Sequence, residues 1–242
     1  MGFAARVFDR CFPNDINHFD GYKTILGEYL TKAHSALDIG CGDNSILSAY
    51  RSADREIWGT DLVVHPHLQS PEWFRKLGTR GQIPFPDATF DVVTCISVLE
   101  HVEDGEMFFR EVSRVLKPSG FFIGHSISGT HYVTWIRRLL DFLPHSAIQL
   151  IVKRLYGRDE ADTFPTCYHL NRMTEIDEAA ATADLSRRAL YRYADQGYFS
   201  VLPPLVPIAT VTDRVLERIS DGWGRLYFTV ILQKVVPEKR PD

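Results

Sequence analysis

The sequence predicts an α/β fold in which a parallel sheet is flanked by helices. Ala36–Ile39 is a short apolar run of the kind that a strand buried on both faces shows. Two glycines, Gly40 and Gly42, end this run, and a helix can begin at Ser45. A second strand is expected over 56–62. Strand, glycine turn, helix and strand together form the first unit of a nucleotide-binding α/β domain.

The remaining elements are expected from the spacing of apolar residues and from proline and glycine. Residues 1–14 should form a loop or an irregular arm. Further strands are predicted over 79–82, 90–96, 120–125, 188–194 and 226–235. Helices are predicted over 15–32, 72–77, 104–116, 131–156 (divided by Pro144), 174–183 and 211–219. Thr174 and Asp177 have the spacing of a capping box.

Length and composition limit the classes of protein to consider. The chain has 242 residues, 45% of them hydrophobic, which suits a single α/β domain over 1–242. A net charge of −4 without a basic run argues against a protein that binds nucleic acid. The four cysteines are widely spaced, so neither a zinc site nor a disulfide framework is indicated, and a reducing compartment, the cytoplasm, is expected.

Two features of the sequence, its start and its apolar runs, bear on contact with a membrane. No signal peptide is visible at the start, and no apolar run reaches the roughly 20 residues that span a bilayer. The apolar stretch 198–211 is better explained as a buried or lid segment, although peripheral contact with a membrane stays open. The sequence gives no indication of the oligomeric state.

Asp61 sharpens the meaning of the glycine turn. It lies about 20 residues after the glycines, where a carboxylate can accept hydrogen bonds from ribose hydroxyls. Glycine at positions 40 and 42 tolerates positive φ and lets a ligand approach the bare backbone. Ser45 stands where a dinucleotide site has its third glycine, which argues against an oxidoreductase that uses NAD.

Four motifs in order resemble one family. They are Leu37-Asp38-Ile39-Gly40-Cys41-Gly42, the run Ile83-Pro84-Phe85-Pro86-Asp87 through Phe90-Asp91-Val92-Val93, Val98-Leu99-Glu100-His101-Val102, and Val115-Leu116-Lys117-Pro118-Ser119-Gly120. Together they are similar to the class I S-adenosylmethionine-dependent methyltransferases, in their branch that acts on small molecules. The resemblance implies a Rossmann-like, seven-stranded sheet whose last strand is antiparallel, with helical lid insertions after the fifth and sixth strands. It covers about half of the chain.

The resemblance also implies an organisation around the cofactor. Residues 1–35 would form an N-terminal helical cap, 36–125 the cofactor-binding core, 126–172 a lid, and 173–242 the rest of the sheet with a second insertion. S-adenosylmethionine would be bound by residues after the first, second and fourth strands and before the fourth. These are Asp38, Gly40, Cys41, Gly42, Asp61, Leu62, Gln82, Ile83 and Ile96.

Each cofactor residue has an implied role. Gly40 and Gly42 would expose backbone to the methionine part, and Asp38 would bind its ammonium group through the backbone or water. Asp61 would accept from the ribose hydroxyls, while Leu62 and Ile83 would cover the adenine. An acid that reads the adenine amino group in many relatives is missing, so Gln82 or backbone groups near it would replace it. Cys95 and Ile96 would flank the methionine carboxylate and the methyl group. Packing, and not a role as nucleophile, is expected for the thiols of Cys41 and Cys95.

Two histidines are candidates for a catalytic base. An oxygen acceptor must lose its proton, and histidine can take it near neutral pH. His101 and His125 both follow strands at the carboxyl edge of the sheet, where ligands bind. No metal site is expected, because Ser97 replaces the first glutamate of the Glu-x-x-Glu-His segment that binds metal in some relatives.

The sequence therefore predicts a methyltransferase that acts on a small molecule, most simply on an oxygen of a natural-product, quinone-like, or lipid or sugar intermediate. N- or C-methylation remains an alternative. A protein that binds the cofactor without catalysis, as a partner of another protein, is a further alternative. A small-molecule acceptor is the expected partner, and nucleic acid is not.

Overall fold

The computed structural model describes residues 3–140, 167–195, 203–220 and 222–236. The chain divides into two compact units. The first unit comprises residues 1–21, 127–166 and 192–228, and the second comprises 22–126, 167–191 and 229–242. The prediction of one domain over 1–242 stays a prediction beside this division.

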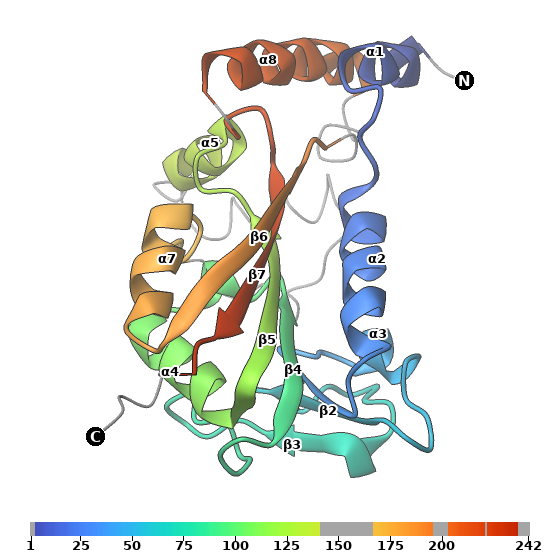
Figure 1. The fold of residues 1–242 in the computed structure, drawn as a ribbon. Helices are drawn as coiled ribbons and strands as arrows, with labels where there is room; N and C mark the ends of the chain where they lie inside the picture. Colours follow the sequence, from blue (N-terminus) through green and yellow to red (C-terminus); the bar gives the residue numbers. More distant parts are fainter. Residues whose placement is uncertain (1–2, 141–166, 196–202, 221, 237–242) are drawn as a thin grey trace. The chain divides into compact units, whose positions relative to one another are not determined.

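A seven-stranded sheet has the strand order β3-β2-β1-β4-β5-β7-β6 (Figure 1). The strands are β1 Ser35–Ile39, β2 Glu56–Asp61, β3 Phe74–Lys76, β4 Phe90–Ile96, β5 Leu116–Ile127, β6 Leu185–Tyr193 and β7 Tyr227–Lys234. β1 pairs in parallel with β2 and β4, and β4 pairs in parallel with β5. The last strand, β7, is antiparallel. The predicted fold class is confirmed.

Helices and short 3₁₀ turns connect these strands. The α-helices are α1 Phe3–Cys11, α2 His18–Leu30, α3 Ser45–Ser48, α4 Gly105–Val115, α5 Tyr132–Leu140, α7 Met173–Ala181 and α8 Val206–Ile219. The 3₁₀ turns are η1 Pro71–Trp73, η2 Leu99–His101 and η4 Pro203–Leu205.

The core of the second unit forms between α2 and the central strands. Tyr22, Leu26 and Leu30 lie on one face of α2 and are fully buried, as the apolar spacing predicts. They belong to one cluster with Val92 of β4 and Ile123 of β5. Both neighbours of β1 are central strands, and four of its five residues are buried. Packing in this cluster thus holds β1, the strand that precedes the glycine turn, in place.

Three sequence predictions about elements are wrong. Residues 3–11 form the helix α1, because Phe8 and Phe12 pack into a small core with Ala194. Residues 74–76, predicted to be helical, form the edge strand β3, which pairs with β2. The strand predicted over 79–82 is a turn, in which the Gly81 N–H donates to the Gly78 carbonyl (2.9 Å).

The third strand shows why its local pattern misleads. Pro71 opens the turn η1, which ends at Phe74 in extended conformation. Backbone pairing with Gly59–Asp61 then outweighs the helical propensity of three residues. The Trp58 ring lies edge-on to those of Trp73 and Phe85, with centroids 5.0 and 5.3 Å away. Long-range contacts therefore decide this segment.

The later part of the chain agrees with the prediction in outline. α5 lies within the helical segment predicted over 131–156, and the rest of that predicted segment lies outside the described residues. α8 begins at Val206, earlier than predicted. The capping box at Thr174 and Asp177 is wrong: the Glu175 carboxylate accepts the Arg172 N–H (3.1 Å) at the start of α7.

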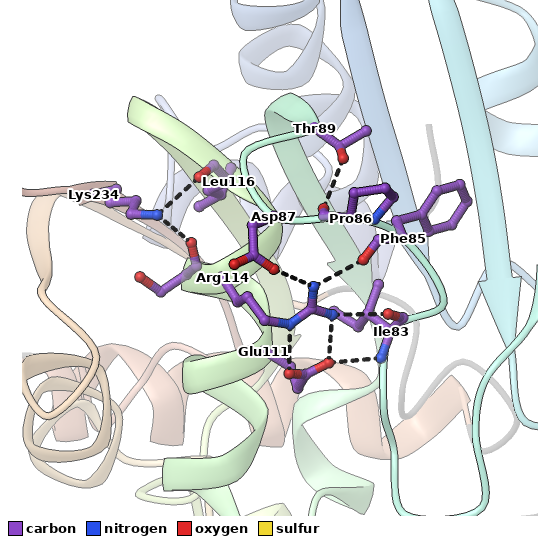
Figure 2. Close-up of polar contacts among 10 residues, drawn as sticks. Ile83, Phe85, Pro86, Asp87, Thr89, Glu111, Arg114, Leu116 and Lys234 are labelled. Atoms are coloured by element: carbon purple, nitrogen blue, oxygen red, sulfur yellow. Dashed lines mark hydrogen bonds and ion pairs between the residues drawn. The ribbon is translucent and has the colours of Figure 1, made fainter.

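Arg114 of α4 forms hydrogen bonds with the loop before β4, residues 83–87 (Figure 2). Its guanidinium donates to both carboxylate oxygens of Glu111, at 2.8 Å each. It also donates to the carbonyls of Ile83 and Phe85 and to the Asp87 carboxylate. The neighbouring carboxylates hold the pKa of Arg114 well above its ordinary value. The loop is thereby held against a helix that packs on the sheet.

Candidate cofactor site

The glycine turn after β1 is tied to β2 by its backbone. The N–H groups of Gly40 and Cys41 both donate to the Thr60 carbonyl, at 2.8 and 3.2 Å. Gly40 has φ +70°, and a Cβ at this position would collide with the Val98 side chain. Gly40 is therefore required by conformation and by the close approach of the segment after β4.

Gly42 has a different environment from Gly40. Its φ is +54°, yet no atom of the described residues lies within 4 Å of the place where a Cβ would stand. The turn is thus open on the side where this glycine exposes its backbone. Its N–H points to the Asp61 carboxylate and donates to Oδ2 (3.0 Å). The open side and the acid lie together at the carboxyl ends of two neighbouring strands.

Asp61 is held at the end of β2 by two backbone donors. Oδ2 accepts the Gly42 N–H, and Oδ1 accepts the Val63 N–H (3.2 Å). Each carboxylate oxygen can accept a second hydrogen bond, because it has two lone pairs. The side chain is only half-buried, so a ligand can reach it. Two fixed oxygens with remaining acceptor capacity suit a pair of adjacent hydroxyl groups.

Asp38 lies on β1, the strand next to β2, which carries Asp61. It is only 2% exposed and sits on β1 beside Gly59 of β2 and Thr94 of β4. Within the described ranges, no hydrogen-bond donor reaches its carboxylate oxygens. Burial, and next the charge of Asp61, raise the pKa of Asp38 from 3.8 to about 8. A ligand cation would compensate this buried acid.

The electrostatics of the turn favour a cationic ligand. Burial and the charges of Asp38, Asp61 and Asp43 raise the pKa of the Cys41 thiol far above its ordinary value, so all three acids act at this turn. S-adenosylmethionine carries an ammonium and a sulfonium group, and its ribose carries two hydroxyls. The donor set therefore fits this cofactor. The pyrophosphate of a dinucleotide would face three acids instead.

The residues expected to surround the adenine differ in their exposure to solvent. Leu62 is 52% exposed beyond the end of β2, and the Gln82 side chain is exposed as well. The Ile83 side chain is buried, its N–H donates to Glu111 (2.9 Å), and its carbonyl accepts from Arg114. The Ile83 N–H thus already has a partner. The adenine contacts of these three residues stay predictions.

The two candidate bases occupy neighbouring strand ends. His125 pairs with Ile96 across β5 and β4, and Ile96 is half-buried. The His125 ring is buried, and its Nδ1 lies 2.9 Å from the hydroxyl of Thr229. His101 ends the turn η2 and is partly exposed. An acceptor molecule can therefore reach His101 more directly than His125.

Two buried polar pairs near these strand ends are absent from the sequence predictions. The Ser126 hydroxyl donates to Glu100, whose pKa is raised by burial. The Tyr22 hydroxyl lies 2.6 Å from that of Thr94, which itself donates to the Ile123 carbonyl. Glu100 stands in the quoted segment Val98–Val102, so its acid beside His101 was a usable signal. Tyr22 and Thr94 gave none, because both fit an ordinary core pattern.

Residues 37–124 match the family described as "Methyltransferase domain". The core of the chain, residues 37–124, is similar to the S-adenosylmethionine-dependent methyltransferases. The matched residues run from β1 to β5, and so include the glycine turn, both acids and the loop that Arg114 holds. The cofactor that this similarity implies for the core is S-adenosylmethionine.

Two curated relatives show how far the similarity extends. A protein of Mycolicibacterium smegmatis, named as a probable S-adenosylmethionine-dependent methyltransferase, is 33% identical over 36% of this chain and 35% of its own. The ubiquinone biosynthesis O-methyltransferase of Neisseria meningitidis is 26% identical over 67% of this chain and 76% of its own. The chain spans about two fifths of the length of the first three curated relatives it matches.

A solved structure extends the comparison of folds beyond the matched core. Geranyl diphosphate C-methyltransferase from Streptomyces coelicolor has a TM-score of 0.56 at 15% identity, over 89% of this chain and 79% of its own. This likeness concerns the fold. Over the part of the chain that the structure describes, no helix has the length and apolarity to cross a bilayer. The same part contains no group of three or more acidic, histidine or cysteine side chains arranged to hold a metal ion.

Proposed function

We propose that this protein transfers the methyl group of S-adenosylmethionine to an oxygen of a small-molecule acceptor. The observation that carries the proposal is the pair of acids beside an open glycine. Asp38 is buried without a donor among the described residues, and Asp61 is fixed 3.0 Å from the Gly42 N–H. A cation and two hydroxyls on one ligand satisfy this arrangement.

The residues of the turn would bind and orient the donor. Bound S-adenosylmethionine supplies an electrophilic methyl group on a sulfonium, so the protein has to position an acceptor and exclude water. Asp61 would accept hydrogen bonds from the ribose hydroxyls, each worth about 1.5–3 kcal/mol to a charged acceptor. Asp38 would face the ammonium group, and the open side of Gly42 would admit the ligand's chain.

Oxygen as the acceptor atom is supported by two facts. The relative from Neisseria meningitidis, similar over two thirds of this chain, is named as an O-methyltransferase. His101, partly exposed at the end of η2, is placed to take the proton that a hydroxyl must lose. The class of acceptor would be a natural-product, quinone-like, or lipid or sugar intermediate. His125 remains a second candidate for the base.

Calorimetric titration tests the cofactor part of the proposal. We expect S-adenosylmethionine and S-adenosylhomocysteine to bind, and NAD not to bind, because NAD brings a pyrophosphate to three acids. Heat from NAD alone would contradict the proposal. The Asp54→Ala variant, altered at an exposed acid outside the turn, provides a matched control.

Methyl transfer itself requires a second assay. Transfer of labelled methyl groups to extracts of the source cells should yield a labelled small molecule, and mass spectrometry would identify a methoxy group. His101→Gln should lower the rate by about 10²-fold or more if His101 is the base. Binding of the cofactor without any transfer would favour a protein that binds the cofactor and acts as a partner.

A further inference from the structure

The helix α8 (Val206–Ile219) exposes a row of apolar side chains and buries the polar Thr210 and Asp213. Ile208, Val211, Val215 and Ile219 are 64, 50, 49 and 67% exposed. Their spacing of three, four and four residues puts them in one row on the helix surface. We call these four residues the apolar stripe. Scattered exposed apolar residues are ordinary, but a continuous row along a helix indicates a contact surface.

The opposite face of α8 is polar and firmly held within the first unit. Asp213 is 4% exposed and lies 3.2 Å from Nε2 of His131, which is itself buried. Glu217 pairs with Arg225 (3.2 Å), and Arg225 also contacts the Asp15 carboxylate (2.7 Å). These ion pairs fix which face of the helix points inward.

Rotation of α8 to bury the apolar stripe would be costly. It would bring the carboxylates of Asp213 and Glu217 to the surface and leave His131 and Arg225 without these partners in the interior. Breaking one member of a buried pair is strongly destabilising, because it leaves an uncompensated polar group. The contacts of Asp213 with His131 and of Glu217 with Arg225 thus keep the apolar stripe exposed to solvent.

The charges beside the stripe have one sign. In the described part of α1 and in α8, the exposed charged side chains are all arginines: Arg6, Arg10 and Arg218. α1 packs against α8 (Figure 1). The ring of Phe12, which follows α1, lies 5.8 and 4.8 Å from the guanidinium groups of Arg214 and Arg225. Exposed basic side chains therefore accompany the apolar row, in a chain whose net charge is −4.

We infer that the apolar stripe of α8 docks on the surface of a membrane that contains anionic lipid. A helix with an apolar face and basic neighbours lies in the plane of the lipid headgroups, and the acyl region receives its apolar side chains. A second copy of the chain is the competing occupant. Anionic headgroups attract the exposed arginines of α1 and α8, whereas a second copy would bring more arginines of the same sign to the contact.

Vesicle flotation tests this inference without any requirement for catalysis. The probes are vesicles of phosphatidylcholine alone and of phosphatidylcholine mixed with phosphatidylglycerol. We expect the full chain to bind the mixed vesicles, more weakly at high salt, and to bind phosphatidylcholine alone poorly. Replacement of Ile208 and Ile219 by serine should weaken binding by about tenfold or more.

Control variants separate the stripe from general surface properties. Val235→Ser with Val236→Ser alters two residues that are 42 and 51% exposed outside the stripe, and should leave flotation unchanged. Arg10→Gln with Arg218→Gln should weaken binding to the mixed vesicles and reduce its dependence on salt. Because the stripe residues are about half exposed or more, their replacement by serine should keep the melting temperature of the folded chain.

Several outcomes would overturn the inference. They are absence of binding to mixed vesicles, equal binding by the Ile208→Ser/Ile219→Ser variant, and equal loss in the Val235→Ser/Val236→Ser control. A dimer in light scattering that the stripe variant abolishes, without binding of vesicles, would assign the stripe to a second copy. Failure of methyl transfer would leave the flotation result unaffected, so the two proposals can fail separately.

Discussion

Asp38 carries an ionisation cost because its carboxyl group lies in the core and faces the charge of Asp61. In the folded protein its pKa is about 8, against an ordinary value of 3.8. The unfolded chain therefore releases this proton at lower pH than the folded chain. Below about pH 4 both states keep the proton, and the contribution of Asp38 to stability then falls as pH rises from about 4 to about 8.

Asp38→Asn should make the ligand-free protein more stable in mildly alkaline solution. The amide keeps the shape of the side chain and never ionises, so the gain should be larger at pH 8 than at pH 5, by about 2 kcal/mol or more. Denaturant unfolding of both proteins at the two pH values measures this. A constant difference between them would mean that Asp38 is already neutralised by a cation. The same variant should bind S-adenosylmethionine more weakly.

Asp61→Ala should weaken the binding of S-adenosylmethionine by about tenfold or more, because a charged hydrogen-bond acceptor for the ribose is lost. The variant also loses the acceptor of the Gly42 N–H, so part of the loss would reflect a looser turn. Calorimetric titration measures the affinity, and Asp54→Ala is the control. Affinity within twofold of the unmodified protein would refute the ribose role.

At the scale of elements, the turn between β1 and α3 has two glycines with separate tasks. Both have positive φ, but only Gly40 lies against another part of the chain, the Val98 side chain. Gly42 faces open space instead. Alanine at either position carries a backbone cost of about 1 kcal/mol, and only at Gly40 is a steric collision added.

The two alanine variants should therefore differ in kind. Gly40→Ala should lower the free energy of unfolding by about 3 kcal/mol, because strain and collision add. Gly42→Ala should lower it by only about 1 kcal/mol, yet weaken cofactor binding by about tenfold, because the new Cβ occupies the open side. Denaturant unfolding and titration with S-adenosylhomocysteine measure both effects. Equal loss of stability in the two variants would contradict this assignment.

Arg114 of α4 makes five described hydrogen bonds, three of them to the loop before β4 and two to Glu111 of its own helix (Figure 2). Arg114→Met keeps the length of the aliphatic chain and removes every donor, so unfolding should become easier by about 2 kcal/mol. Hydrogen exchange should rise first at Ile83–Asp87. Lys117→Met, which removes an ion pair at the base of β4, is a matched control and should leave exchange in that loop unchanged.

Sequence reasoning predicted the elements whose pattern is local and long enough. The predicted ends of β4 agree with the observed ones because its residues form a continuous buried apolar run, and α2 is predictable from its apolar row. β3 failed since three residues at the edge of a sheet obtain their conformation from β2. α1 failed because its apolar residues meet Ala194, which is remote in sequence.

The candidate site was predictable to a similar limit. The positions of Gly40, Gly42 and Asp61 followed from spacing, because a strand followed by a turn repeats in known ways. The hydrogen bonding of Ile83 with Glu111 and Arg114 did not, because it depends on how a loop lies on a helix. The same holds for the buried contact of Glu100 with Ser126.

At the scale of the whole molecule, the two compact units contain different stabilising interactions and functional residues. The first unit contains the buried pair His131 and Asp213 and the ion pair of Asp15 with Arg225. The second unit contains the glycine turn and both cofactor acids. Stability and cofactor binding can therefore be altered independently.

Asp213→Ala should lower stability by about 3 kcal/mol, because His131 keeps its burial and loses its partner. Hydrogen exchange should increase in α5 and α8, while the affinity for S-adenosylhomocysteine should stay within twofold, since the residues proposed to bind it belong to the second unit. Exchange mass spectrometry and titration test both parts. Increased exchange in β1 or β4 ahead of the two helices would show that the units open together.

Cys41 gives the glycine turn a chemical property beyond binding. Only the thiolate of a cysteine reacts readily with electrophiles and oxidants, and the neighbouring acids together with burial keep this thiol protonated. The same negative field that would attract a sulfonium therefore protects the sulfur beside it from alkylation, including accidental methylation by the donor. The anionic turn thus makes a cysteine chemically inert beside a reactive alkyl group.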